Sequence, residues 1–207
     1  MTYTIRKQAT YMAGKVHLSF LALPVEIVYR ILDNLEPKTI LLSLRNVCER
    51  LNKITDTYPR YQTLTTLNLE FNQIGPLGAQ HLTDALQHNM TLTTLNLVVN
   101  QIGPLGAQHL ADALQHNMTL ITLDLRANKI GDIGAQHLAD ALQHNTTLTT
   151  LNLGGNQIGA LGAQHLADAL QHNTTLTTLD LHSNRIGHIL ETRLKELIER
   201  NNERTKS

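Results

Sequence analysis

The stretch that decides the fold is LTTLNLEFNQIGPLGAQHLTDALQHNMT, which occupies residues 64–91. Near-identical copies follow with a period of 28 residues and begin at Leu92, Leu120, Leu148 and Leu176. The last of these copies loses the pattern after Gly187. A period in this range that opens with LxxLxLxxN predicts stacked units, each of which contributes one strand and one helix. Such arrays provide extended binding surfaces, so the pattern favours a binding protein over an enzyme.

Each repeat divides into an extended half and a helical half. Leu67 and Leu69 alternate with polar residues on a short Thr-rich segment, and Gly75–Pro76 then indicates a turn. From Gly78 onward the apolar residues follow helical spacing, at Leu82, Ala85 and Leu86. One unit cannot bury these side chains alone. Stacking buries about seven large aliphatic residues per unit, worth roughly 1.5–3 kcal/mol each before entropy is subtracted.

Asparagine recurs at two positions of the repeat. The first set lies in a leucine-rich stretch, where each amide is expected to bond backbone groups of the turn: Asn72, Asn100, Asn128, Asn156 and Asn184. The second set opens N-x-T sequons: Asn89, Asn117, Asn145 and Asn173. These would be glycan acceptors in a secreted chain, but copying of one sequon with its repeat explains them equally. Asn89 also suits a left-handed exit from its helix.

The segment LTTLNLEFNQIGPLGAQHLTDAL resembles the ribonuclease-inhibitor type of leucine-rich repeat, whose pattern is LxxLxLxxNxIxxxGxxxLxxxL. The resemblance extends over about residues 64–190. It implies an α/β solenoid in which parallel strands line a concave face and helices lie outside. The final segment, ETRLKELIERNNERTKS, departs from the pattern. A charged amphipathic helix at this place is expected to cap the open end of the core, so the fifth repeat is predicted to be a cap.

Bulk composition excludes several classes of partner. Lys plus Arg equals Asp plus Glu, 17 each, so no net charge attracts nucleic acid or an anionic membrane. The single cysteine, Cys48, cannot form an internal disulfide, which fits a reducing compartment. The apolar run at residues 18–25 is too short to span a bilayer and lacks a small-residue cleavage site. We therefore expect a cytoplasmic or nuclear protein.

Composition changes near residue 60. Six of the seven aromatic residues lie at or before Tyr61, and Tyr58–Pro59 is a natural boundary because the residue before a proline is pushed out of helix. We therefore predict an N-terminal tail at 1–18, a helical module at 19–60 and the repeat domain at 61–207. A helical module of about 40 residues is small for independent stability and needs the repeats or a partner.

The helical module, within which residues 23–54 read LPVEIVYRILDNLEPKTILLSLRNVCERLNKI, resembles an F-box. The resemblance rests on the opening Leu23–Pro24, on the turn at residues 35–38, and on Arg45, Val47 and Cys48. It implies docking onto a Skp-type adaptor of a cullin–RING ubiquitin ligase, with the C-terminal repeats recruiting the target. The residues expected to bind the adaptor are Leu23, Pro24, Ile27, Ile31, Leu35, Pro37, Leu41 and Leu44. The alternative is a generic helical cap on the repeats.

Side chains that could perform chemistry form no catalytic arrangement in the sequence. There is no nucleophile with a base, no phosphate-binding glycine loop and no CxxC, so we expect no catalytic residues and no cofactor. His81, Asp84 and His88 share one helical stripe that recurs in the next three repeats. Copying explains this recurrence, and a zinc site would need three ligands converging at one place, so no metal is expected.

Variation between the repeats identifies the candidate target surface. Framework positions are constant, whereas the two residues after each short strand differ in every repeat: Glu70–Phe71, Val98–Val99, Arg126–Ala127, Gly154–Gly155 and His182–Ser183. We predict that Glu70, Phe71, Val98, Val99, Arg126 and His182 bind a short segment or loop of a target protein on the concave face. The alternatives are a plain leucine-rich-repeat interaction module and a small-GTPase regulator that uses Arg126.

Overall fold

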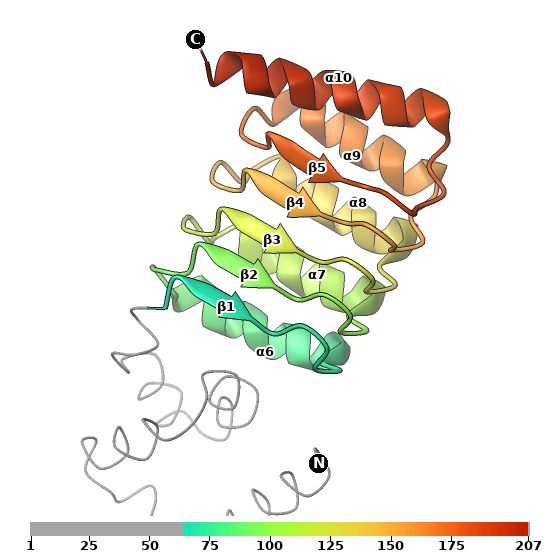
Figure 1. Ribbon diagram of the computed structural model, residues 1–207. Helices are drawn as coiled ribbons and strands as arrows, with labels where there is room; N and C mark the ends of the chain where they lie inside the picture. The colour runs from blue at the N-terminus through green and yellow to red at the C-terminus, as the bar shows by residue number, and fades with distance from the viewer. Residues whose placement is uncertain (1–63, 207) are drawn as a thin grey trace, which may run out of the picture. The chain divides into compact units, whose positions relative to one another are not determined.

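Strand and helix alternate five times along residues 64–206, the part of the chain that the computed structural model describes. The elements are β1 (Thr66–Asn68), α6 (Gly75–His88), β2 (Thr94–Asn96), α7 (Gly103–Leu114), β3 (Thr122–Asp124), α8 (Gly131–Leu142), β4 (Thr150–Asn152), α9 (Ala160–His172), β5 (Thr178–Asp180) and α10 (His188–Arg204). The strands pair in the order β1-β2-β3-β4-β5, all parallel, and the helices cover one side of the sheet (Figure 1). The predicted solenoid of parallel strands is confirmed.

The register of the sheet places equivalent residues of successive repeats side by side. Thr66 pairs with Thr94, and each later pairing has the same offset of 28 residues. Every repeat position therefore forms a straight column across the five strands. A column of leucines such as Leu67 and Leu95 faces the helices, and the polar residues between them face the other side.

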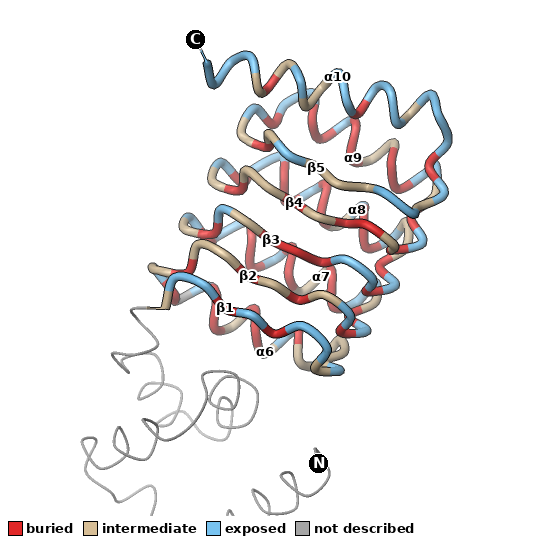
Figure 2. The backbone as a smooth tube through the Cα atoms, viewed as in Figure 1, coloured by how far each residue is buried: buried red, intermediate tan, exposed pale blue. Residues whose placement is uncertain are grey.

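The core lies between the sheet and the helices, as the buried segments in Figure 2 show. Leu69 and Leu82 are both buried, which confirms the two apolar periods seen in the sequence. The helix begins at Gly75, three residues before the predicted start at Gly78. Gly75 makes the turn with φ of +63°, and Pro76 fits the first helical turn, where its missing N–H costs no bond.

The predicted asparagine ladder is present, and Asn128 illustrates it. The side chain is fully buried; its Nδ2 donates to the carbonyls of Leu97 at 2.8 Å and Leu125 at 3.0 Å. Its Oδ1 accepts the backbone N–H of Asn100 at 2.9 Å. From Asn100 onward, each asparagine therefore joins its own turn to the preceding repeat and satisfies backbone groups that would otherwise be buried without partners.

The sequon asparagines form a second ladder, at the helix ends. Asn117 is buried; its Nδ2 donates to the carbonyl of Leu86 at 2.8 Å and its Oδ1 accepts the N–H of Leu120 at 2.8 Å. The prediction of a left-handed helix exit at Asn89 is wrong, because its backbone is extended, with φ −83° and ψ 123°. This conformation lets its Oδ1 reach forward to the N–H of Leu92 at 2.6 Å.

The last helix closes the end of the stack. In α10, Asn201 is fully buried, and its Nδ2 donates to the carbonyls of Asn173 at 3.0 Å and Leu176 at 2.9 Å. Arg200 donates from Nη2 to the carbonyl of Leu170 at 2.6 Å. The cap therefore reproduces the bonds that the next repeat would supply.

Residues 1–63 lie outside the described part of the chain, and with them the predicted tail, the helical module and all eight predicted adaptor-binding residues. Among the helices that are described, none combines the length and the apolar character needed to cross a membrane.

Candidate functional site

The candidate site is the strand face opposite the helices, where three columns of side chains are presented. One column is threonine throughout, and the next is Asn68, Asn96, Asp124, Asn152 and Asp180. The third column holds the first of the two variable residues, Glu70, Val98, Arg126, Gly154 and His182. Since the register is constant, these five residues lie on neighbouring positions across the sheet.

The second variable residue of each repeat lies in a left-handed turn. Phe71, Val99, Ala127 and Ser183 have φ between 54° and 58°, and Gly155 has φ of 66°. A positive φ is uncommon for residues with a side chain, and β-branched valine is especially unusual there. The chain therefore leaves the strand alternation at this point, and the side chain of Phe71 is 69% exposed.

The β1–β2 end of the surface combines an apolar group with a fixed carboxylate. Phe71 and Val99 are exposed and Val98 is half-buried. The Glu70 carboxylate accepts from the side-chain amides of Asn68 and Asn96, both at 3.3 Å. These residues provide an apolar surface with one acidic edge.

Arg126, on the third repeat, is held by Asp124, two residues earlier on the same strand. Its Nε lies 2.9 and 3.0 Å from the two carboxylate oxygens, and its Nη2 donates to Oδ2 at 2.6 Å. The hydrogen bond and charge of Asp124 raise the pKa of the guanidinium above its ordinary value. The arginine is thus a fixed cation, with 45% of its side chain exposed.

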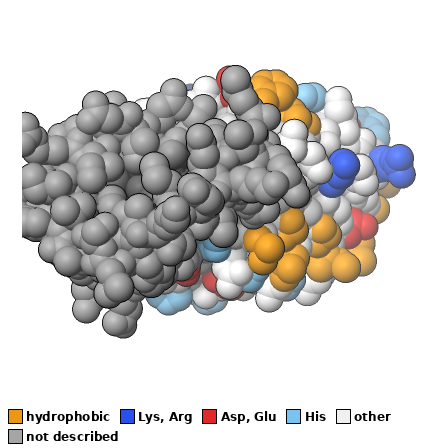
Figure 3. All heavy atoms as spheres, turned by 90° about the horizontal axis from the view of Figure 1, so that it is seen from below, with side chains coloured by type: hydrophobic (Ala, Val, Ile, Leu, Met, Phe, Trp, Pro, Cys, Tyr) orange, Lys and Arg blue, Asp and Glu red, His pale blue; other side chains and the backbone are white. Residues whose placement is uncertain are grey.

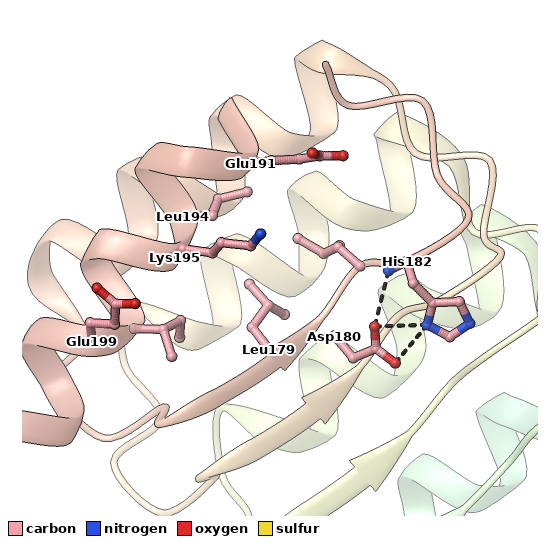
Figure 4. A pocket seen from close by; sticks show the side chains of 9 residues that line it. Leu179, Asp180, His182, Glu191, Leu194, Lys195 and Glu199 are labelled. Carbon is pink, nitrogen blue, oxygen red and sulfur yellow. Dashed lines mark hydrogen bonds and ion pairs between the residues drawn. The ribbon is translucent and has the colours of Figure 1, made fainter. Parts of the chain in front are cut away.

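His182, on the last repeat, is held in the same way by Asp180. Its Nδ1 lies 2.8 and 2.7 Å from the two carboxylate oxygens (Figure 4). Burial alone would raise the pKa of Asp180. The hydrogen bonds from His182, together with the charges of His182 and Arg126, outweigh that effect and lower the pKa.

The imidazole of His182 lies over Gly154 of the neighbouring strand. A Cβ added at Gly154 would stand 2.3 Å from Cε1 of the ring, so a side chain there would require the imidazole to move. The glycine therefore makes room for the imidazole on the concave face. The carboxylate that holds Arg126 belongs to Asp124, and it also accepts from the Asn152 side-chain amide of the next strand at 3.3 Å.

Sequence reasoning named the six target-surface residues but missed the two carboxylates that hold two of them. Asp124 and Asp180 replace asparagine only in the repeats that carry Arg126 and His182 two residues later. That coincidence was the signal that could have identified both pairs, since strand neighbours at i and i+2 lie on one face.

A second set of exposed apolar residues lies at the helix starts, one per repeat. In Figure 3, hydrophobic side chains gather in two places on the described repeats. The set consists of Leu77, Leu105, Ile133, Leu161 and Ile189.

The histidine stripes on the helices bring no three metal-ligating side chains together within residues 64–206.

Comparison with known families identifies the two parts of the chain. The F-box domain family matches residues 20–63, and the leucine-rich-repeat family matches residues 62–82 and 88–111. The TMOD/LMOD leucine-rich domain family matches residues 106–207. The chain therefore carries an F-box domain followed by leucine-rich repeats, as the sequence resemblances implied. Both are typically modules of interaction without enzymatic activity.

The repeats are also similar to solved structures. Leiomodin-1 actin-binding site 2 is 25% identical over 70% of this chain and 84% of that chain, with a TM-score of 0.65. The tropomodulin C-terminal domain from Caenorhabditis elegans is 15% identical over 82% of this chain and 95% of its own, with a TM-score of 0.65, and shows the fold alone. No curated protein matches the chain.

Proposed function

We propose that this protein is a substrate-recognition subunit of an SCF-type cullin–RING ubiquitin ligase, without enzymatic activity of its own. The F-box at residues 20–63 docks a Skp-type adaptor, and the repeats hold the target on the concave face. The observation that carries the proposal is the pairing of an F-box with a repeat surface whose two residues after each strand differ in every repeat. The proposal places the protein in the cytoplasm or nucleus, where such ligases act.

The concave surface supports binding of a short protein segment. Phe71 and Val99 offer an apolar contact, Arg126 offers a cation and His182 offers an imidazole, and carboxylates already orient the last two side chains. Binding energy concentrates at aromatic and arginine side chains surrounded by polar groups. A target segment would therefore contact both parts of the surface if it placed an apolar residue over Phe71 and a polar or acidic group near Arg126.

The decisive experiment is affinity purification of the full chain with mass spectrometry, comparing wild type with Leu23→Ala/Pro24→Ala. We expect adaptor and cullin peptides with wild type and their loss in the double variant, while repeat-bound target peptides remain. Retention of the adaptor by the folded double variant would show that these two residues do not form the contact. Target peptides without any adaptor or cullin would support a plain interaction module instead.

A second candidate for the repeats is actin binding. The similarity of the repeats to leiomodin-1 actin-binding site 2, and the match of the TMOD/LMOD leucine-rich domain family to residues 106–207, favour it. Under this proposal actin is the protein held by the repeats, and the F-box proposal is unaffected. Co-sedimentation and pyrene-actin assays with the full chain test it, and a chain that neither pellets with filaments nor changes polymerisation contradicts it.

A further inference from the structure

At the C-terminal edge of the sheet, Asn202 of α10 donates to the carbonyl of Thr177 at 3.0 Å, and the part of the edge after Asp180 is open within residues 64–206. In each earlier repeat, two backbone N–H groups donate to carbonyls of the next strand: Leu153 to Asp180 at 2.8 Å, and Gly155 to His182 at 2.9 Å. The equivalent groups on the last repeat belong to Leu181 and Ser183. Within residues 64–206, neither of these N–H groups meets an acceptor. The edge of β5 therefore presents two backbone donors two residues apart.

A pocket of about 400 Å³ lies beside these donors, between β5 and α10 (Figure 4). Its apolar walls are Leu179 and Leu181 from the strand side and Leu194 and Ile198 from the helix. The equivalent leucines of earlier repeats, such as Leu151 and Leu153, are fully buried under the next strand, whereas Leu179 and Leu181 remain half-exposed. In the earlier repeats, the next strand covers the equivalent leucines. In the last described repeat no strand does so, and the pocket lies in that place.

The charges around the pocket select what can enter it. Three of the lining residues carry carboxylates, Asp180, Glu191 and Glu199, and two are basic residue types, Lys195 and His182, of which His182 lies 2.7 Å from a carboxylate oxygen of Asp180. An incoming strand in register with the sheet would place the residue between its two apolar side chains next to Asp180, in the column that asparagine and aspartate occupy. A basic side chain at that position would lie beside the Asp180 carboxylate, on the face opposite α10.

We propose that this edge binds an extended segment of a partner protein as a sixth parallel strand. The segment has the pattern apolar-basic-apolar, with its two apolar side chains in the pocket and its carbonyls accepting from Leu181 and Ser183. Strand addition of this kind draws affinity from main-chain hydrogen bonds and specificity from alternate side chains. Asp180 and His182 belong both to this surface and to the concave columns, but the proposal rests on the strand edge and does not depend on the proposed ligase function.

The probe is a fluorescein-labelled peptide with the sequence of residues 92–102, LTTLNLVVNQI, carrying N96K. We expect it to bind the full chain, and NMR hydrogen exchange at the Leu181 and Ser183 amides to slow by at least about tenfold at saturation, because hydrogen bonding protects amides from exchange. The matched peptide carrying N96E is expected to bind more weakly. The peptide carrying L95D and L97D is expected not to bind.

On the protein side, Leu181→Asp and Ile198→Asp each place a charge in the pocket and are expected to weaken peptide binding at least about tenfold, or about 1.4 kcal/mol. The matched control is Ile133→Asp, on an exposed aliphatic residue outside the pocket, and it leaves binding unchanged. If one of these variants unfolds the last repeat, its loss of binding is uninformative. The exchange of the Leu181 and Ser183 amides in the wild-type chain with peptide then decides the test.

Three results would overturn the proposal. The first is unchanged exchange at both amides with saturating peptide, and the second is equal binding of all three peptides. The third is protection that rises with protein concentration in the absence of peptide, with a matching rise in mass by light scattering. That third result would assign the edge to a second copy of this chain.

Discussion

At the scale of single residues, charge on the concave surface is organised as pairs within one strand. Asp124 holds Arg126 and Asp180 holds His182, each carboxylate lying two residues before its basic partner. The Arg126 and His182 side chains are exposed, and ion pairs that solvent reaches in this way add little to stability. Their effect is orientation: a side chain already fixed loses less freedom on binding, which favours affinity.

Phe71 provides the first prediction at this scale. Because the ring is 69% exposed, Phe71→Ala removes little buried surface and is expected to leave the thermal midpoint nearly unchanged. Binding of the target captured by affinity purification should weaken by about 2 kcal/mol, the loss expected for an aromatic anchor. Titration calorimetry and thermal unfolding of the same variant measure both. A lowered midpoint with unchanged target affinity would assign Phe71 to folding rather than binding.

Asp180 provides a pH prediction. Its folded pKa lies below its ordinary value, so its stabilising contribution is present above the unfolded pKa of about 3.9 and is lost as pH falls through the lower folded pKa. Asp180→Asn removes this contribution, which is at most about 0.5 kcal/mol for such an exposed pair. Urea unfolding at pH 6 and pH 3 should show the gap between wild type and variant closing at the lower pH. A gap of equal size at both pH values would contradict the assignment.

At the scale of the repeat, the sequence predicted the strand and the helix from the spacing of apolar residues, but it predicted the turn conformations less well. The leucine spacing predicted both the strand and the helix, and the buried polar position predicted the Asn128 ladder. The second ladder was missed because an asparagine after a helix usually indicates a left-handed exit, whereas Asn89 is extended. The left-handed turns at Phe71 and Val99 were also missed, because neither residue type demands a positive φ.

The Asn128 ladder yields the prediction for this scale. Asn128→Ala leaves the backbone N–H groups of Asn100 and Ile102 without their buried acceptor, at a cost of about 1–3 kcal/mol. Since stability in a solenoid passes between neighbours, hydrogen exchange should accelerate in the repeats on both sides of β3. The exposed Lys129→Ala is the matched control and should leave exchange unaltered. Acceleration confined to the mutated turn would contradict coupling between repeats.

At the scale of the described repeats as a whole, the array depends on its last helix. Each repeat contacts its neighbours, so within residues 64–206 the terminal unit has one neighbour only, which it contacts through α10 on α9 and β5 on β4. The composition of the final segment predicted a cap, and the bonds from Arg200 and Asn201 to the preceding repeat provide the mechanism. The sequence could not show that the cap leaves the β5 edge open, because that depends on the path of α10.

Asn201 tests this dependence. Asn201→Ala removes two buried hydrogen bonds, to the carbonyls of Asn173 and Leu176, and is expected to cost about 1–3 kcal/mol. Exchange should accelerate first in α10 and β5 and progressively less toward β1, which peptide-resolved mass spectrometry can follow. The exposed neighbour Glu203→Ala serves as the control. Uniform acceleration across all five repeats would mean that residues 64–206 open as one unit.

The constant register gives this chain an adjustable length. Because both ladders and the strand pairing connect residues 28 apart, a deletion of one whole period, such as 120–147, rejoins surfaces that already match. It would bring Val98–Val99 beside Gly154–Gly155 and remove Arg126, rewriting the concave face without altering the interfaces. Near-identical copies are also the substrate on which unequal recombination acts. The recognition surface of this protein can therefore evolve by gaining or losing entire strands, as well as by substitution.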